Sequence, residues 1–129
     1  GWLYMAKNGA TTVWEAWEGS AAVNGGIASL DHYSKGAVCR WLFDTMCGIR
    51  VDGENHFIIA PKPGGHITYA KADYTSVYGQ VTSEWKYKGE QIEYRISIPA
   101  NCTAEIILPD GACCMQEACS KIYSTQIGK

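Results

Sequence analysis

The sequence of 129 residues lacks a strong excess of charge of either sign. Eleven Lys and Arg residues stand against 13 Asp and Glu residues, which gives a formal net charge of −2. Basic and acidic residues are interspersed, so the sequence has no basic stripe for nucleic acid and no polybasic segment for a membrane surface. We therefore expect neither nucleic acid nor a membrane as a partner.

Long hydrophobic segments are also missing. The longest apolar runs are short, as at residues 38–46, which include Arg40 and Asp44, whereas a membrane-spanning helix needs about 20 apolar residues. No signal peptide is apparent, and the chain starts at Gly1 with an apolar segment directly behind it. Such a start is expected of a piece of a larger protein, in which any targeting signal would lie upstream of Gly1.

The six cysteines are not spaced as the staples of a small disulfide-rich domain. Cys39 and Cys47 fall in one expected helix, roughly 12 Å apart, whereas a disulfide allows a Cα distance of about 7 Å. Cys113 and Cys114 are adjacent and lack the spacer of zinc knuckles. We expect reduced, partly buried thiols, no metal and no cofactor. Unpaired cysteines favour a cytoplasmic compartment without establishing it.

The hydrophobic pattern changes near residue 50 from helical to alternating. Apolar residues recur at steps of three and four between residues 30 and 46, which predicts an amphipathic helix. Ser29 is the expected N-cap of this helix, and Gly48 is its expected C-terminal stop. Gly36 lies inside the helix at a cost of about 1 kcal/mol relative to Ala, which indicates a close approach of a neighbouring helix or a ligand.

After Arg50 the alternation of apolar and polar residues predicts strands only. They are expected at residues 56–60, 67–73, 81–87, 91–98 and 104–108, with turns at residues 63–65, 88–90 and 109–111. Trp41, Trp85 and Phe57 are expected core residues. The regular spacing favours an antiparallel β-sandwich over a barrel. We therefore predict a mainly β chain with a helical segment at residues 1–50 and a β-sandwich domain at residues 51–129.

The segment around Glu15 is the strongest candidate for chemistry. Trp14 and Trp17 flank Glu15, so a sugar ring stacked on an indole would bring its hydroxyls or a water within reach of the carboxylate. The alternative is a helix start with exposed acids, which the helix dipole favours without any catalytic role.

Short motifs along the chain closely resemble those of bacterial α-L-rhamnosidases, and they occur in the same order. They are GATTVWE (9–15), DHY (31–33), GAV (36–38), WL (41–42), GIR (48–50), FII (57–59), PGG (63–65), YG (78–79), SEW (83–85), IPAN (98–101) and LPDG (108–111). The resemblance fades after about Gly111. It implies a large enzyme in which an (α/α)6 catalytic barrel precedes a C-terminal β-sandwich. Residues 1–50 are then the closing segment of the barrel.

This resemblance implies a glycosidase that removes terminal α-L-rhamnosyl residues with inversion, which requires a general acid and a general base. Glu15 matches the general base of the family, and His32 matches a histidine that hydrogen-bonds the rhamnose. Trp14 and Trp17 are the expected aromatic contacts of the sugar. The general acid belongs to an upstream segment of the family, so we predict that the 129-residue chain is inactive alone.

The chemistry of these roles sets further expectations. A general base has to stay ionised, and Thr11, Thr12 and the two indole nitrogens are the candidate hydrogen-bond donors to Glu15. His32 is expected in the first turn of the helix at residues 30–46, where the helix dipole keeps the imidazole neutral.

Two other functions compete with the enzyme hypothesis: a non-catalytic carbohydrate-binding sandwich and a purely structural sandwich. An aromatic platform of Tyr69, Tyr74 and Tyr78 would serve the first, although packing roles are more common for such tyrosines. The expected partners are a rhamnose-containing glycoside and the upstream part of the catalytic barrel. A homo-oligomer of the chain is also expected, because barrel helices without their neighbours leave apolar faces uncovered.

Overall fold

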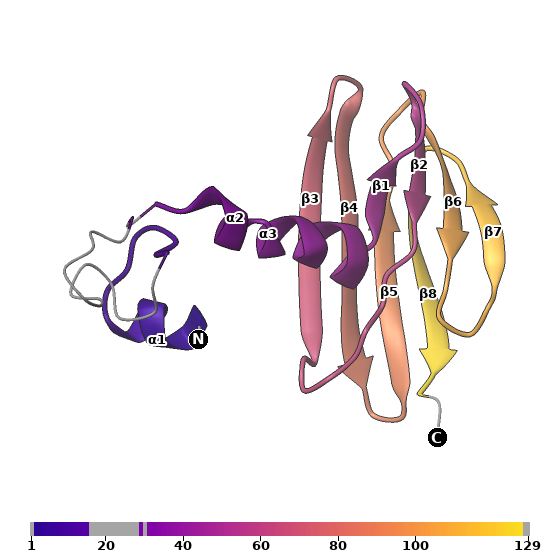
Figure 1. The fold of residues 1–129 in the computed structure, drawn as a ribbon. Helices are drawn as coiled ribbons and strands as arrows, with labels where there is room; N and C mark the ends of the chain where they lie inside the picture. The colour runs from indigo at the N-terminus through magenta and orange to yellow at the C-terminus, as the bar shows by residue number, and fades with distance from the viewer. Residues whose placement is uncertain (1, 16–28, 30, 128–129) are drawn as a thin grey trace. The chain divides into compact units, whose positions relative to one another are not determined.

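The computed structural model describes residues 2–15, 29 and 31–127 (Figure 1). The chain divides into two compact units, Gly1–Arg40 and Trp41–Lys129. None of the described helices is long and apolar enough to cross a membrane.

The first unit begins with helix α1, Trp2–Lys7, whose buried residue is Met5. The chain folds back on this residue after the helix ends. The amide of Ala10 donates to the Met5 carbonyl at 3.0 Å, and the amide of Trp14 donates to the Met5 sulfur at 3.3 Å. Met5 therefore anchors the segment that leads to Glu15.

The helix predicted at residues 30–46 starts later and is interrupted. It consists of α2, Tyr33–Gly36, then α3, Val38–Trp41, and a π-helical turn η2, Leu42–Met46. The N-cap is His32, in an extended conformation with φ −108° and ψ 108°. The prediction of Ser29 as the N-cap was wrong, because the helix begins only at Tyr33, four residues later, and the Ser29 hydroxyl bonds the backbone of Asp31. His32 also lies before the first helical turn and not inside it.

The sequence predicted a structural role for two glycines of this helical segment, Gly48 and Gly36. Gly48 follows the C-cap residue Cys47 with φ +71°, so its predicted role as the helix stop is confirmed. A Cβ at Gly36 would meet no atom within 4 Å. No described residue comes within this distance, and the close approach of a neighbouring helix or a ligand stays a prediction.

The second unit consists largely of two four-stranded sheets, which Figure 1 shows face to face. The first sheet has the order β1-β2-β6-β7, with β1 Ile49–Val51, β2 His56–Ile59, β6 Thr103–Ile107 and β7 Cys113–Gln116. The second has the order β3-β4-β5-β8, with β3 Tyr69–Ser76, β4 Gly79–Lys88, β5 Gln91–Ser97 and β8 Ser120–Gln126. The predicted mainly β fold with a β-sandwich is confirmed.

Most pairings are antiparallel as predicted, but β2 and β6 pair in parallel. The second sheet supplies the three strands that come between β2 and β6 in the chain. A parallel neighbour of this kind requires a long crossover connection, and the excursion through the other sheet provides it.

The core of the sandwich lies between the sheets and holds Trp85, Tyr94 and Phe57 as its largest fully buried side chains. The Trp85 indole donates to the Met46 carbonyl at 2.8 Å, and the Ser83 hydroxyl donates to the Cys47 carbonyl at 2.6 Å. These bonds satisfy carbonyls at the end of η2 that have no helical partner. They attach the helix end to β4.

Trp41 departs from the expected core, because 54% of it is exposed. The expectation of partly buried thiols holds for two of the six free cysteines. Cys47 and Cys102 are buried, whereas Cys39, Cys113, Cys114 and Cys119 are exposed.

Burial of the thiols predicts a difference in their reactivity. Burial raises the pKa of Cys47 to about 11 and also raises the pKa of Cys102, and only the thiolate attacks a disulfide reagent. In a titration with an aromatic disulfide reagent near pH 8, we expect the exposed thiols to react first. The two buried thiols should react only after urea is added. Equal rates for all six thiols in the native protein would contradict the described fold.

Cys47 also predicts how stability depends on pH. The unfolded chain loses this proton near the ordinary pKa of 9.0, whereas the folded chain keeps it to about 11. The stabilisation by the protonated thiol is therefore complete below pH 9 and is lost as the pH rises from 9 to 11. Over this range the free energy of unfolding falls by about 3 kcal/mol in total. Urea unfolding across this range should show a steeper loss in the wild type than in Cys47→Ala.

Candidate functional site

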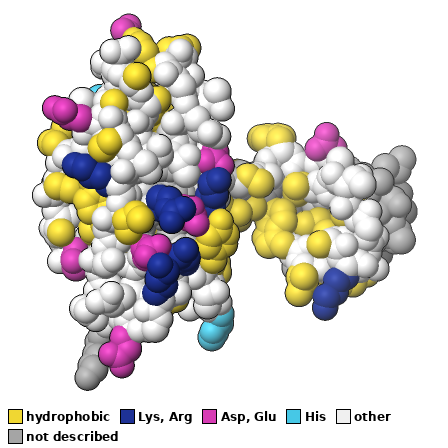
Figure 2. Space-filling model, turned by 180° about the vertical axis from the view of Figure 1, so that it is seen from behind, with side chains coloured by type: hydrophobic (Ala, Val, Ile, Leu, Met, Phe, Trp, Pro, Cys, Tyr) yellow, Lys and Arg dark blue, Asp and Glu magenta, His cyan; other side chains and the backbone are white. Residues whose placement is uncertain are grey.

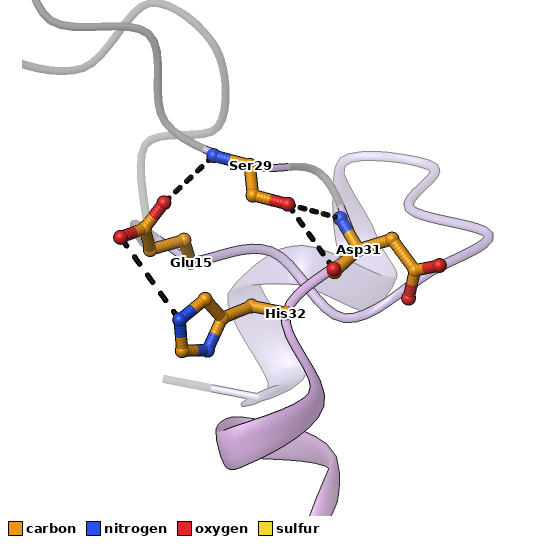
Figure 3. A network of polar contacts seen from close by, with 4 residues as sticks. All are labelled: Glu15, Ser29, Asp31 and His32. Carbon is orange, nitrogen blue, oxygen red and sulfur yellow. Dashed lines mark hydrogen bonds and ion pairs between the residues drawn. The ribbon is translucent and has the colours of Figure 1, made fainter.

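Glu15 is fixed to Ser29 by two hydrogen bonds, and Figure 3 draws the one that the Glu15 carboxylate accepts. The Glu15 amide donates to the Ser29 carbonyl at 2.8 Å. In the other direction, the Ser29 amide donates to Oε2 of the Glu15 carboxylate, also at 2.8 Å. The two residues on either side of residues 16–28 are thus joined, and one carboxylate oxygen has a defined position.

His32 is brought to the same place by its own backbone. Its amide donates to the Val13 carbonyl at 2.7 Å, which keeps residue 32 extended and delays the helix to Tyr33. As a result, Nε2 of the imidazole lies 4.0 Å from Oε1 of Glu15. Figure 3 shows the two side chains pointing toward each other, while the Asp31 carboxylate points away from them.

The two side chains differ in their access to solvent. The Glu15 side chain is 48% exposed, and the His32 side chain is 31% exposed. The His32 ring stacks on Tyr33 with a centroid distance of 5.8 Å and an interplanar angle of 17°. Nδ1 of His32 is buried and has no hydrogen-bond partner in the described part of the chain. The imidazole is therefore held in place mainly by ring stacking and by its backbone.

The structure does not place every predicted site residue. Trp14 is half-buried beside Glu15, with its amide on the Met5 sulfur. Trp17 lies within residues 16–28, outside the described residues. The structure thus brings Glu15 and His32 together and leaves the role of Trp17 a prediction.

A donor that the sequence did not reveal is the backbone amide of Ser29. Thr11 and Thr12 are exposed, and their roles as donors to Glu15 stay predictions. A backbone amide is present at every residue except proline, so no residue type marks this contact. Only the folding of residue 29 against residue 15 makes it.

The described residues offer no site for a metal ion, since no three His, Cys, Asp or Glu side chains gather among them. The alternative aromatic platform is not formed either. Tyr69 and Tyr74 are five residues apart in β3 and lie on opposite faces. Tyr74 packs edge-on against Phe57 and Phe43 on the core side.

Comparison with known families decides the family of this chain. Residues 50–118 match the bacterial alpha-L-rhamnosidase C-terminal domain, and residues 1–46 match the bacterial alpha-L-rhamnosidase six-hairpin glycosidase domain. The chain belongs to the bacterial α-L-rhamnosidase family. The family predicted from the motifs is therefore confirmed.

Individual α-L-rhamnosidases are similar to this chain over most of the chain's length. The α-L-rhamnosidase of Formosa agariphila is 36% identical over 114 residues, which are 84% of this chain and 12% of the relative. That of Streptomyces avermitilis is 34% identical over 115 residues, again 84% of this chain and 11% of the relative. The chain thus spans about an eighth of the length of these relatives.

Solved rhamnosidase structures share the fold. The α-L-rhamnosidase of Aspergillus terreus has a TM-score of 0.88 and 25% identity, covering 100% of this chain and 16% of that structure. The Streptomyces avermitilis α-L-rhamnosidase complexed with L-rhamnose has a TM-score of 0.79 and 28% identity, covering 98% and 15%. The rhamnosidase-family chain therefore corresponds to a small part of each of these proteins.

Proposed function

We propose that this chain is part of a glycoside hydrolase that removes terminal α-L-rhamnosyl residues with inversion, and that Glu15 is its general base. The observation that supports this most is the convergence of Glu15 and His32, with Nε2 and Oε1 4.0 Å apart. Family membership supports the reaction class. The relative from Streptomyces avermitilis was crystallised with L-rhamnose, which supports the sugar.

The contacts of Glu15 support its proposed role as the general base. In an inverting glycosidase the base removes a proton from a water that attacks the anomeric carbon opposite the leaving oxygen. The Ser29 amide holds Oε2, and Oε1 faces the imidazole of His32. A carboxylate fixed in this way directs one oxygen toward the water without first losing rotational freedom.

His32 is proposed to bind the sugar beside this water. A neutral imidazole both donates and accepts hydrogen bonds, which suits a sugar hydroxyl. Nε2 is the ring nitrogen on the side of Glu15, so we assign this nitrogen to the hydroxyl nearest the reacting carbon. Trp14 and Trp17 are proposed as the aromatic surface on which the sugar ring stacks.

The proposed partner is the upstream part of the catalytic barrel. Figure 2 shows hydrophobic side chains on the surface of the Gly1–Arg40 unit, and Trp2, Leu3 and Tyr4 of α1 are exposed. Apolar helices of this kind are expected to pack against further helices. Because the general acid of the family belongs to the upstream segment, we propose that the chain acts only within the larger enzyme. Self-association of the chain alone stays a prediction.

Substitution of His32 tests the sugar contact. In the full-length enzyme, His32→Ala is expected to raise KM for an aryl α-L-rhamnoside about 10- to 100-fold, because a hydrogen bond to the sugar is lost. His32→Gln should retain part of the affinity, since its amide still donates. Tyr33→Phe is the matched control, because it keeps the ring that stacks on His32. A KM unchanged by His32→Ala would remove His32 from the sugar site.

A further inference from the structure

A cavity of about 380 Å³ opens in the sandwich unit and contains neither Glu15 nor His32. Its volume lies near the lower end of the range of about 300–1,000 Å³ that is typical of small-molecule pockets. The residues that give it a chemical character are Tyr87, Ile92, Thr125, Pro63, Pro109 and Asp110. The function proposed above does not use any of them.

The floor of this cavity is one row of side chains across the second sheet. The strand register pairs Tyr87 of β4 with Ile92 of β5, and Ile92 with Thr125 of β8. Ile92 and Thr125 are buried, so the row lies on the face of the sheet that turns toward the core. The Tyr87 ring is oriented by an edge contact with Trp85, at a centroid distance of 6.1 Å.

The walls come from two loops. Pro63 belongs to the segment between β2 and β3, and Pro109 and Asp110 belong to the turn between β6 and β7. Oδ1 of Asp110 accepts a hydrogen bond from the Ala112 amide at 2.9 Å. This bond orients the carboxylate, and within the described residues its other oxygen has no hydrogen-bond partner.

The combination of these groups fits a sugar. A pyranose presents C–H groups that pack on aromatic and aliphatic surfaces, and hydroxyls that donate to a carboxylate. Tyr87, Ile92 and two prolines of the cavity offer a surface for the C–H groups, and Asp110 offers a carboxylate for the hydroxyls. Among the residues that the structure describes, no Lys, Arg or His lines the cavity, so an anionic ligand would meet the Asp110 carboxylate without a compensating cation from them.

We propose that this cavity binds one neutral pyranose unit of a glycan, at a site separate from Glu15. Such binding would hold a glycan substrate on the enzyme by a second contact, which raises the effective concentration of the substrate at the catalytic site. The proposal goes beyond the proposed hydrolysis, because it requires no catalytic residue.

Titration of the 129-residue chain by ¹H–¹⁵N NMR tests this site. We expect saturable shifts of the Gly111, Ala112 and Ile127 amides with methyl α-L-rhamnopyranoside, at concentrations up to ~50 mM. D-glucose serves as a second neutral probe, and a response to either sugar supports the proposal. The absence of saturable shifts at these amides with both sugars would overturn it.

Substitutions make the result specific to the cavity. Asp110→Asn keeps the carbonyl oxygen that accepts from Ala112, and is expected to weaken binding about fivefold or more. Tyr87→Leu should do the same by removing the ring. Asp52→Asn, an exposed aspartate in the turn between β1 and β2, is the matched control and should bind as the wild type does. Unchanged affinity in both cavity variants, with folded spectra, would contradict the assignment.

The Glu15→Gln chain separates this proposal from the general-base proposal. Its cavity amides should shift as in the wild type, because Glu15 does not line the cavity. If sugar instead shifts only the amides near Glu15 and His32, the cavity proposal fails while the proposed function stands.

Discussion

Replacing Glu15 by Gln in the full-length enzyme is expected to lower kcat by about 10²- to 10⁴-fold, with KM changed only a few-fold. Gln has nearly the shape of Glu, and its carbonyl oxygen can still accept from the Ser29 amide, the bond that holds Oε2 in the wild type. What it loses is the ability to take a proton from water. The measurement is steady-state hydrolysis of an aryl α-L-rhamnoside.

Asp31→Asn is the matched control for this substitution. Asp31 is close to Glu15 in the fold, but its carboxylate points away from Glu15 and His32 (Figure 3). We expect its kcat to stay within a few-fold of the wild-type value. A Glu15→Gln enzyme with nearly full turnover would exclude Glu15 as the base. A loss of similar size in Asp31→Asn would show that the effect is not specific to Glu15.

Gly48→Ala is expected to have the largest effect on stability. A Cβ at this position would lie 2.1 Å from the carbonyl carbon of Ala60, which is far inside van der Waals contact. The two backbones cannot simply separate, because the Ala60 amide donates to the Gly48 carbonyl at 2.9 Å. The φ of +71° adds strain for any residue with a Cβ.

We therefore expect Gly48→Ala to cost more than about 4 kcal/mol, a large share of the total stability of a domain. Gly89→Ala is the control, because Gly89 has a similar φ of +61° but a Cβ added there would meet no atom within 4 Å. It should lose only about 1–2 kcal/mol, the cost of the backbone conformation alone. Urea unfolding followed by tryptophan fluorescence measures both values. Equal losses would show that contact with Ala60 does not matter.

The strands of the sandwich were predictable where buried and exposed residues alternate along the sequence. Val81, Ser83 and Trp85 point into the core as the pattern of β4 indicates. Where polar residues are buried, the pattern fails. Gln116 of β7 is fully buried, with its amide donating to the Ile96 and Cys119 carbonyls, so a polar residue stands where a hydrophobic one would signal a strand.

The hydrophobic pattern also fails to predict strand β8. Thr125 is buried while Ile122 is 58% exposed, so the hydrophobicity of the residues opposes their actual orientation. Tyr123 shares the inward face with Thr125, and its hydroxyl donates to Gln116 at 2.9 Å. Polar contacts between β7 and β8 thus replace the apolar burial on which a sequence pattern depends.

The candidate site was predictable only in part for a similar reason. Glu15 and His32 were predicted through a family resemblance, and the fold brings their side chains together. Their geometry depends on backbone hydrogen bonds that join Glu15 to Ser29 and His32 to Val13. These bonds carry no residue signature, so neither the Ser29 donor nor the start of the helix at Tyr33 followed from the sequence.

Chemical rescue of a Glu15→Ala variant of the full-length enzyme by azide is the most direct test of the general-base role. Azide is already a nucleophile and needs no base, so it can attack the anomeric carbon from the side that the water would have used. We expect azide to restore turnover in a concentration-dependent way and to yield the β-L-rhamnosyl azide, identified by NMR. No gain with azide, or formation of the α-azide, would contradict Glu15 as the base of an inverting enzyme.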